Sequence, residues 1–329
     1  MKVLVTGATG FIGSALCRAL CAQDIEVIAF RRPLSILKEI ENLPVSHRIG
    51  DLCDAASIED AFAEKPELVF HLGAQMAAGR NKSRMMDINI AGTRRVFQAA
   101  IRNDVRRVIL VSTAFTLGVP EGSPGASASG LMTEEHVWNF SADRWPYAWS
   151  KYLAEREVQL ASAHGLDAVI LNPTFVIGPG DHYRRTNSFL VRMKKKPPFF
   201  LVDGGVNLVH VQDVVNGMIQ AAELGKSGER YILGGRNISF DDLYTMMSEI
   251  AGFRVPKLVL SNRLSKGIFN FLNSKSNPAN IGSMEANLFQ FAGHFFYYDI
   301  RKARLALRLP PARDLRVSLE ETWNWFKGN

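Results

Sequence analysis

The stretch GATGFIG at residues 7–13 decides the fold that this sequence predicts. It directly follows a short apolar run that is typical of a β-strand, and it opens a helical pattern over residues 11–22. Gly7 allows a tight turn, Gly10 lets the backbone approach a ligand closely, and Gly13 lets the helix pack near the strand. The helix N-terminus then offers free N–H groups and the positive end of a dipole to phosphate. The loop therefore favours dinucleotide binding over an ordinary glycine turn.

Short apolar runs alternate with helical patterns through the first half of the chain. These runs are rich in β-branched residues on both faces, which is typical of parallel strands covered by helices. We expect strands near 3–5, 25–30, 45–49, 68–72, 108–112 and 168–171, and helices near 11–22, 55–63, 85–102 and 147–164. This alternation predicts an α/β fold with a Rossmann-type, doubly wound parallel sheet.

The second half is less regular and predicts a smaller C-terminal substrate lobe. Residues 231–233 are expected to add one strand, and Ser239 with Asp242 three positions on is typical of a helix N-cap. We expect an NAD(P)-binding Rossmann domain over 1–172 and about 206–236, and a substrate-binding lobe over 173–205 and 237–329.

Two segments stand out by composition. Residues 113–145 form a long stretch rich in Gly, Ser and Pro, and long loops in compact domains are usually functional. Residues 253–298 are rich in aromatic side chains. These predict either an apolar pocket for a flavonoid-like, steroid-like or lipid-linked ketone, or the ordinary core of the lobe. Residues 182–185, after a Gly-Pro-Gly turn, are expected to meet either a polar substrate group or solvent.

The residues after the second predicted strand bear on the choice between NADP and NAD. NAD-binding folds place a carboxylate about 20 residues past the glycines, where it holds the ribose 2′-hydroxyl. Here Phe30 is followed by Arg31 and Arg32, with no acid. Guanidinium groups pair with a 2′-phosphate, and Lys38 adds a further positive charge. The pattern favours NADP(H), while NAD stays open if the arginines are ordinary surface charges. Asp51 is expected to bind adenine or to cap a helix.

Tyr147 and Lys151 share one face of a predicted helix because they are four residues apart. A tyrosine pKa near 10 is too high for a base at neutral pH, and a neighbouring ammonium with the positive nicotinamide favours the phenolate. Tyr147 is therefore the expected general acid/base of a carbonyl–alcohol interconversion. A carbonyl oxygen also needs a fixed hydrogen-bond donor. Thr113, at the end of the fifth strand, is the first candidate, followed by Ser112 and Thr116.

Charge and cysteine content exclude several classes of protein. The 329 residues carry 39 Lys and Arg against 32 Asp and Glu, a formal net charge of +7. Basic proteins bind nucleic acids, anionic lipids or phosphorylated small molecules, but here the basic residues are scattered, so no nucleic-acid partner is expected. Three cysteines without a Cys-x-x-Cys motif argue against disulfides and zinc and fit a reducing cytosol, which predicts a cytoplasmic protein without a metal. The sequence contains no run of 18 apolar residues, so no membrane-spanning segment is expected.

The motifs together resemble those of the extended short-chain dehydrogenases/reductases, also called the NAD-dependent epimerase/dehydratase family. The resemblance covers nearly the whole chain and rests on TGATGFIG at 6–13, GDL at 50–52, FHLGA at 70–74, Asn89 before Gly92-Thr93, STA at 112–114, YAWSK at 147–151 and NPTFVIGPGD at 172–181. Within this family, FRRP at 30–33, NLVHVQDVV at 207–215 and ERYILGG at 229–235 are most similar to dihydroflavonol 4-reductase-like proteins. The hopanoid-associated sugar epimerases are the most similar subgroup.

The resemblance implies a Ser/Thr–Tyr–Lys triad, which falls on Thr113, Tyr147 and Lys151. It also implies a homodimer packed through the helices near 85–102 and 147–164. With the residues derived above, the expected cofactor contacts are Gly7, Thr9, Gly10, Phe11, Ile12, Gly13, Arg31, Arg32, Lys38, Asp51, Leu52, Leu72, Gly73, Asn89, Ser112, Tyr147, Lys151, Pro173 and Val176.

Three departures from the family pattern qualify these expectations. Thr113 stands where serine is commoner, which a hydroxyl donor tolerates. Gly73 replaces the usual alanine, with little effect expected. Asn172 stands where many sugar epimerases carry arginine, which weakens a nucleotide-sugar interpretation.

Three functions remain open at this stage. The pattern favours an oxidoreductase that moves a hydride between NADP(H) and a ketone or secondary alcohol. A sugar or nucleotide-sugar epimerase/dehydratase with retained NAD would use the same triad. A non-catalytic NADP-binding regulator is less favoured, because such relatives usually lose the tyrosine or the lysine and this chain keeps both.

Overall fold

The computed structural model describes residues 1–76, 81–120, 130–143, 145–182, 191, 194–195, 200–256, 258–260 and 293–328. A seven-stranded sheet has the order β10-β6-β5-β4-β1-β2-β3, and each pair of neighbours is parallel. Its strands are β1 (Lys2–Thr6), β2 (Glu26–Arg31), β3 (Val45–Ile49), β4 (Leu68–His71), β5 (Arg107–Val111), β6 (Ala168–Pro173) and β10 (Arg230–Leu233). This confirms the doubly wound parallel sheet, and each strand lies where the sequence predicts it to within two residues.

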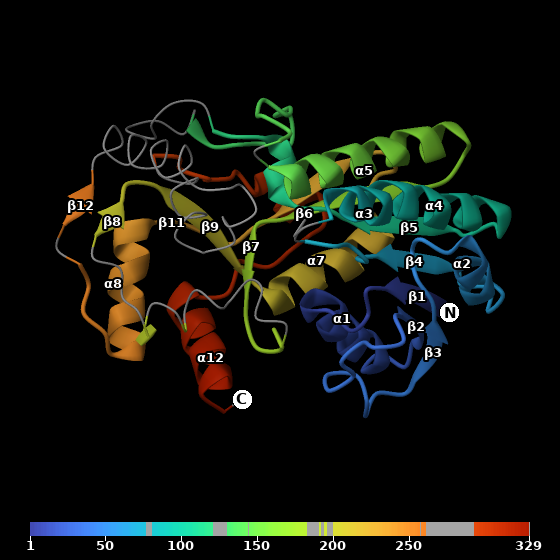
Figure 1. The fold of residues 1–329 in the computed structure, drawn as a ribbon, viewed down its shortest axis with the longest axis horizontal. Helices are drawn as coiled ribbons and strands as arrows, with labels where there is room; N and C mark the ends of the chain where they lie inside the picture. Colours follow the sequence, from blue (N-terminus) through green and yellow to red (C-terminus); the bar gives the residue numbers. More distant parts are fainter. Residues whose placement is uncertain are drawn as a thin grey trace.

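Helices cover both faces of this sheet (Figure 1). They are α1 (Phe11–Cys21), α2 (Ala55–Phe62), α3 (Lys82–Met86), α4 (Gly92–Arg102), α5 (Pro146–Ala163) and α7 (Val211–Leu224). In β1, Val3 and Val5 face a core shared with α1 and α7, whereas Leu4 faces a core shared with α2, α4 and α5. Because successive side chains of a strand point to opposite faces, an apolar run of this kind is buried on both sides.

One predicted helix is interrupted. The segment expected as a helix near 85–102 consists of α3, the π-helical turn η1 (Asp87–Ala91) and α4. A single π-helical turn often marks a functional site. Here it carries Asn89, whose side chain is buried and makes hydrogen bonds with two other segments.

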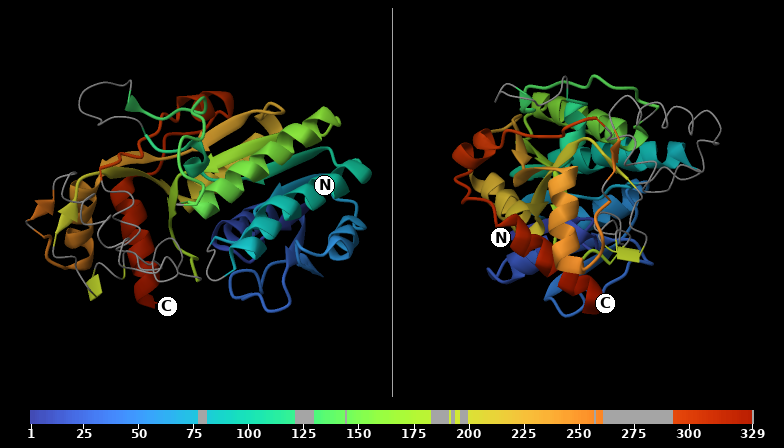
Figure 2. Two further views of the ribbon diagram at one scale, coloured as in Figure 1. Left: turned by 45° about the horizontal axis from the view of Figure 1, so that its top comes forward. Right: turned by 90° about the vertical axis from the view of Figure 1, so that its left-hand side faces the viewer.

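A second, smaller group of elements lies at the opposite end of the molecule from β3 (Figure 1). It contains a three-stranded sheet of β7 (Phe175–Ile177), β9 (Gly205–His210) and β11 (Arg236–Ser239), and a pair formed by β8 (Leu201–Val202) and β12 (Val259–Leu260). Helices α8 (Phe240–Ala251) and α12 (Leu315–Gly328) pack against each other, and α11 (Arg301–Ala306) packs on β10 (Figure 2). The exact division of the chain into two domains stays a prediction.

Local details follow the sequence where short-range chemistry dominates. Ser239 caps α8, accepting a hydrogen bond from the Asp242 backbone N–H at 3.1 Å and donating to the Asp242 carboxylate at 2.7 Å. This confirms the predicted cap.

Most of the aromatic segment 253–298 lies outside the described residues, as do Tyr183, Arg184 and Arg185. Within the part of the chain that the structure describes, no helix has the length and apolar character needed to cross a bilayer.

Candidate active site

The glycine loop has the geometry that a pyrophosphate requires. Gly7 has a φ of +71°, and a Cβ there would lie 2.9 Å from the Gly73 nitrogen. A Cβ on Gly13 would lie 2.2 Å from the Gly7 carbonyl oxygen, so helix α1 can approach β1 only with glycine at this position. Gly10 is the N-cap of α1 and provides no capping side chain. The first N–H groups of α1 are therefore available to a phosphate, and the loop fits the cofactor that the sequence predicts.

Strand ends place the remaining cofactor residues around this loop. Leu72 and Gly73 follow β4 directly beside Gly7, and Leu52 lies against Gly73, where it leaves little room for an alanine side chain. Thr9, Phe11 and Ile12 lie in the loop and the first turn of α1, while Pro173 ends β6 and Val176 is buried in β7. The expected contacts of these residues with a cofactor stay predictions.

Basic side chains gather where the second strand ends. The Arg31 Nε donates to His47 Nδ1 at 3.3 Å, and its Nη1 lies 3.4 Å from the Arg32 carbonyl oxygen. Burial, and then the Arg31 charge, hold the pKa of His47 below its usual value, so this ring is a neutral acceptor. Arg32 and Lys38 are exposed. Among the residues that the structure describes, no carboxylate forms an ion pair with Arg31 or Arg32, so their charges are available to an anion.

Asp51 is not the cap of α2. That position is held by Asp54, whose carboxylate accepts the Ala56 N–H at 3.0 Å. Asp51 instead accepts the Cys53 N–H at 2.9 Å and lies 3.5 Å from Arg84 Nη2. Of the two predicted roles the capping one is therefore wrong, because the helix begins one turn later than a cap at Asp51 requires.

Helix α5 positions the tyrosine and the lysine. Pro146 forms the first turn, where its missing N–H needs no acceptor, and Tyr147 is partly exposed. Lys151 is 2% exposed and its Nζ donates to the Val111 carbonyl at 2.9 Å. Burial lowers the pKa of Lys151 to about 8, against the opposing influence of the Glu155 carboxylate. The contact with Val111 ties the lysine to the end of β5, immediately before the candidate hydroxyl donors.

The three candidate hydroxyls differ in what their protons can reach. The Thr113 Oγ1 accepts the Phe115 N–H at 3.4 Å, which leaves its proton free to donate. Ser112 Oγ is buried and has no hydrogen-bond partner among the described residues, which is rare unless a ligand or water completes it. Thr116 is fully buried, and its single proton faces the Thr113 carbonyl at 2.8 Å and the Glu155 carboxylate at 2.7 Å. The geometry therefore supports Thr113 or Ser112, not Thr116, as a donor to a bound molecule.

A chain of hydrogen bonds runs behind these groups. The Gly73 N–H donates to Thr6 Oγ1 at 3.0 Å, and Thr93 Oγ1 donates to the Asn89 carbonyl at 2.7 Å. His71 joins these two hydroxyls: its Nδ1 lies 2.7 Å from Thr6 Oγ1 and its Nε2 lies 3.0 Å from Thr93 Oγ1. Both hydrogen bonds form when the imidazole is neutral and Nε2 carries the proton. Burial, and then the Lys151 charge, lower the pKa of His71 to about 3.

Asn89 has a bridging role that sequence reasoning missed. Its Oδ1 accepts the Gln75 N–H at 2.8 Å, and its Nδ2 donates to the Gln75 carbonyl at 3.0 Å and to Ser150 Oγ at 2.8 Å. Ser150 Oγ in turn donates to the Tyr147 carbonyl at 2.7 Å. Asn89 thus joins the segment after β4 to the first turn of α5. A direct contact between Asn89 and a cofactor stays a prediction.

An aromatic cluster is formed around Phe115, which follows Thr113 by two residues in the chain. Phe115 contacts Trp145, Phe175 and Phe296, with ring centroids 5.2, 5.4 and 5.6 Å away. Phe140 lies 5.1 Å from Trp145. Sequence reasoning missed Phe115 and Trp145, although a signal was present, because they lie two residues from Thr113 and Tyr147.

Two histidines, His182 and His210, have partners within the chain. His182 Nε2 contacts the Glu39 carboxylate, and its ring lies 4.9 Å from that of Trp325. His210 caps α7 through Nδ1, and its Nε2 lies 3.1 Å from Glu321 Oε2. His182 stays partly exposed in the structure, so its expected contact with a substrate group or with solvent stays a prediction.

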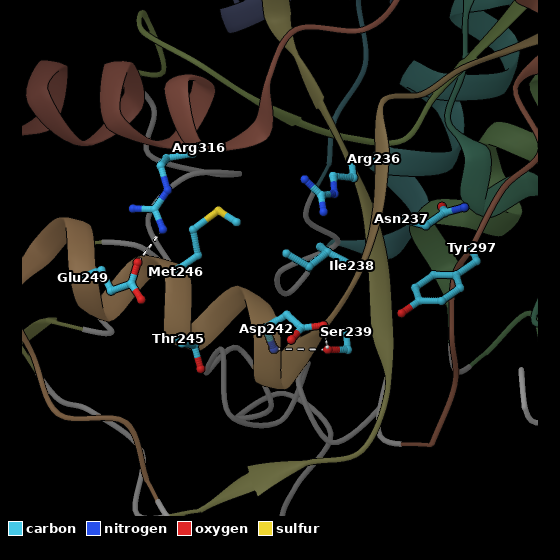
Figure 3. A pocket seen from close by; sticks show the side chains of 10 residues that line it. All are labelled: Arg236, Asn237, Ile238, Ser239, Asp242, Thr245, Met246, Glu249, Tyr297 and Arg316. Carbon is cyan, nitrogen blue, oxygen red and sulfur yellow. Dashed lines mark hydrogen bonds and ion pairs between the residues drawn. The ribbon is translucent and has the colours of Figure 1, made fainter.

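A separate cavity of about 370 Å³ lies between β11, α8 and the beginning of α12 (Figure 3). None of the triad residues lines it. Its two arginines are matched by two carboxylates, and Arg316 already pairs with Glu249. The cavity therefore does not select an anion by charge, and the candidate active site lies at the strand ends instead.

Comparisons with known proteins agree with this geometry. The family described as "NAD dependent epimerase/dehydratase family" matches residues 3–234. A Synechocystis protein named as a candidate dihydroflavonol 4-reductase is 30% identical over 99% of this chain and 94% of its own length. Sterol demethylase protein B of Methylococcus capsulatus is 33% identical over 82% of this chain and 80% of its own. The crystal structure of gox2253 is similar with a TM-score of 0.84 and 30% identity, covering 99% of this chain and 98% of that one.

Proposed function

The chain belongs to the NAD-dependent epimerase/dehydratase family and is an enzyme of that family, and from this premise we propose that it is an NADP(H)-dependent reductase. The proposed reaction interconverts a ketone and a secondary alcohol. The observation that carries the proposal is the buried Lys151, held 2.9 Å from the carbonyl of Val111 at the end of β5. That contact joins the lysine of the Tyr147–Lys151 pair to the residue that directly precedes Ser112 and Thr113, which supports the proposed triad.

Each side chain of the proposed active site has a separate role in the reaction. A bound nicotinamide cofactor supplies or accepts the hydride. Thr113, with Ser112 as the second candidate, donates a hydrogen bond to the substrate oxygen and fixes the carbonyl. Tyr147 gives that oxygen its proton in reduction and removes it in oxidation. The Lys151 ammonium stabilises the phenolate that is left behind.

The preference for NADP(H) over NAD rests on the end of β2. Within the described part of the chain Arg31 and Arg32 have no paired acid, and a guanidinium group is suited to bind a 2′-phosphate with charge-assisted hydrogen bonds. The expected cofactor set is that of the sequence analysis, with Arg31 as the main phosphate ligand.

The substrate class is inferred from the aromatic cluster of Phe115, Trp145, Phe175 and Phe296. Apolar rings beside the hydroxyl donor favour a ketone attached to an apolar ring system over a sugar. Relatives of the chain carry the names of reductases of such molecules, which supports the same choice. An epimerase/dehydratase with retained NAD is the alternative, and Asn172 in place of a family arginine weighs against a nucleotide sugar.

A homodimer and a cytoplasmic location belong to the proposal as expectations. The dimer would pack through α4 and α5, whose outer faces carry long polar side chains and exposed Leu160. Sedimentation of the intact chain tests this expectation.

The Tyr147→Phe substitution tests the catalytic assignment. We expect kcat for a reduced ketone to fall by about a thousandfold, because general acid catalysis is lost. The dissociation constant for NADPH, measured by nicotinamide fluorescence, is expected to change by less than about twofold. Turnover at the wild-type rate would remove Tyr147 from the mechanism.

A further inference from the structure

Helix α5 carries a buried carboxylate one turn beyond Lys151. Glu155 lies four residues after Lys151 and eight after Tyr147, so the three share one face of the helix. Glu155 is 2% exposed. A buried carboxylate is unfavourable unless donors and a cation compensate it, so its partners indicate why it is there.

The partners of Glu155 come from three other elements. Its Oε1 accepts hydrogen bonds from Thr116 Oγ1 at 2.7 Å and from Asn172 Nδ2 at 2.8 Å. Its Oε2 accepts no hydrogen bond from the residues that the structure describes, but it lies 3.5 Å from Arg230 Nη2. Arg230 is on β10, next to the strand that carries Asn172. The negative charge of Glu155 is therefore compensated by Arg230 on the neighbouring strand, because Asn172 is neutral and cannot compensate it.

The same two donors also hold the backbone of Thr113. Thr116 Oγ1 lies 2.8 Å from the Thr113 carbonyl, and Asn172 Nδ2 lies 3.0 Å from it. Thr116 has one proton and Asn172 has two, and Asn172 Nδ2 also lies 3.0 Å from Thr116 Oγ1, so three protons serve three oxygens. The carboxylate is the stronger acceptor and orients both side chains. The carbonyl of the proposed donor residue is therefore fixed indirectly by Glu155.

The Glu155 charge also acts on Lys151. Burial lowers the pKa of Lys151 to about 8, and the Glu155 carboxylate is the charge that raises it. Among the described residues, the titratable or charged groups that face Lys151 are Tyr147 and Glu155 on its own helix and His71 on β4, and Arg230 on β10 faces Glu155. His71 is neutral near pH 7 because its pKa is about 3.

From these contacts we propose that Glu155 is a positioning residue of the catalytic centre, which keeps Lys151 in its ammonium form and holds the Thr113 carbonyl in place. The proposal rests on the proposed function, since it assigns Lys151 and Thr113 their catalytic roles. Glu155 touches neither substrate nor cofactor in this account and acts through its two neighbours.

The direct test is the titration of Lys151 in the full-length, unliganded protein, followed by the 13Cε resonances of labelled lysines. The resonance with the lowest pKa is expected to belong to Lys151. In the Glu155→Gln variant this pKa is expected to fall by about one pH unit, since an opposite charge nearby has been removed. The Glu157→Gln variant is the matched control. Glu157 is also buried on α5 but pairs with Arg94 on α4, at 2.8 Å, so the pKa of Lys151 is expected to stay unchanged.

An unchanged Lys151 pKa in Glu155→Gln would overturn the proposal. If that variant does not fold, Glu155→Met combined with Arg230→Met removes both charges without leaving one unpaired, and a smaller fall of the Lys151 pKa is expected, because the Arg230 charge that opposes Glu155 is removed as well. In the Glu155→Asp variant, which keeps the charge, the pKa is expected to return at least halfway to the wild-type value.

The pH profile of kcat adds a readout that a merely structural role would not move. Activity requires the ammonium form of Lys151, so it is lost as pH rises through the Lys151 pKa. In Glu155→Gln the alkaline decline is expected to begin about one pH unit lower, whereas loss of rigidity alone would lower kcat equally at every pH. Because the lysine titration needs no substrate, a failed search for turnover counts against the reductase and not against the role of Glu155.

Discussion

The two ends of the proposed active site are built in different ways. The glycine loop at the cofactor end depends on contacts between backbone atoms: a Cβ on Gly13 would collide with the Gly7 carbonyl at 2.2 Å, and one on Gly7 with the nitrogen of Gly73 at 2.9 Å. The substrate end consists of side chains from distant segments, where Phe115 meets Trp145 and Phe296. Backbone contacts tolerate almost no substitution, whereas side-chain contacts can be repacked. We infer that the first end preserves one cofactor while the second adapts to the substrate.

Among the substitutions that test this comparison, the largest effect on stability and cofactor binding is expected at Gly13. The Gly13→Ala variant would press a methyl group against a backbone oxygen that cannot move without opening the loop. We expect the free energy of unfolding to fall by about 3 kcal/mol and NADPH to bind at least about tenfold more weakly. Denaturant unfolding and nicotinamide fluorescence measure the two quantities.

Gly217 is the matched control for Gly13. It is also a buried glycine in a helix that packs on the sheet, but its Cβ would meet the end of the Leu233 side chain, at 2.7 Å. Because that side chain can change rotamer, Gly217→Ala is expected to change stability by less than about 1 kcal/mol. Equal losses in the two variants would contradict the distinction between backbone and side-chain contacts.

A smaller effect is expected at the ribose end of the cofactor site. Removing the Arg31 guanidinium in Arg31→Ala should weaken NADPH binding by about 10- to 100-fold, the worth of a charge-assisted hydrogen bond. The affinity for NADH is expected to stay the same, since NADH lacks the phosphate. Arg304→Ala, which removes an exposed arginine on α11, controls for the change in net charge. An equal loss for both cofactors in Arg31→Ala would contradict the phosphate assignment.

The sequence predicts the strands and the glycine loop of the cofactor end well, because both depend on contacts that are local in the chain. Glycine spacing, strand periodicity and the missing acid after Phe30 are local signals, and the strands lie within two residues of their expected positions. Tyr147 and Lys151 are also local, because four residues along one helix fix their relation. The roles of Glu155 and Asn89 are not local. Each depends on side chains brought together from three or four elements, and a single sequence shows no sign of that assembly.

The π-helical turn η1 is a second feature that the sequence does not predict. The segment 85–102 has helical periodicity, but Asn89 bonds to Gln75 and Ser150 and not to solvent. We infer that these tertiary hydrogen bonds help to stabilise the irregular turn. Helix propensity alone carries no information about them.

The smallest effect concerns the hydrogen-bond chain behind the triad. His71 has a pKa of about 3 in the folded protein and about 6.5 when unfolded, so below pH 6.5 the unfolded chain takes up a proton that the folded chain refuses. Stability should therefore fall by about 1.4 kcal/mol per pH unit between pH 6 and 4 on this account. In His71→Gln that part of the slope is expected to disappear, as measured by urea unfolding at each pH. A variant with the wild-type slope would show that His71 takes up a proton in the folded state as readily as in the unfolded one.

The reductase assignment itself is tested most directly by net consumption of NADPH. The purified wild-type protein is mixed with NADPH or NADH and with a panel of ring ketones and sugar nucleotides, and the nicotinamide absorbance is followed. The account predicts consumption of NADPH with an apolar ring ketone, at a kcat/KM at least about tenfold above that with NADH. Protein that arrives with NAD already bound, consumes no NADPH and interconverts a sugar nucleotide would contradict it.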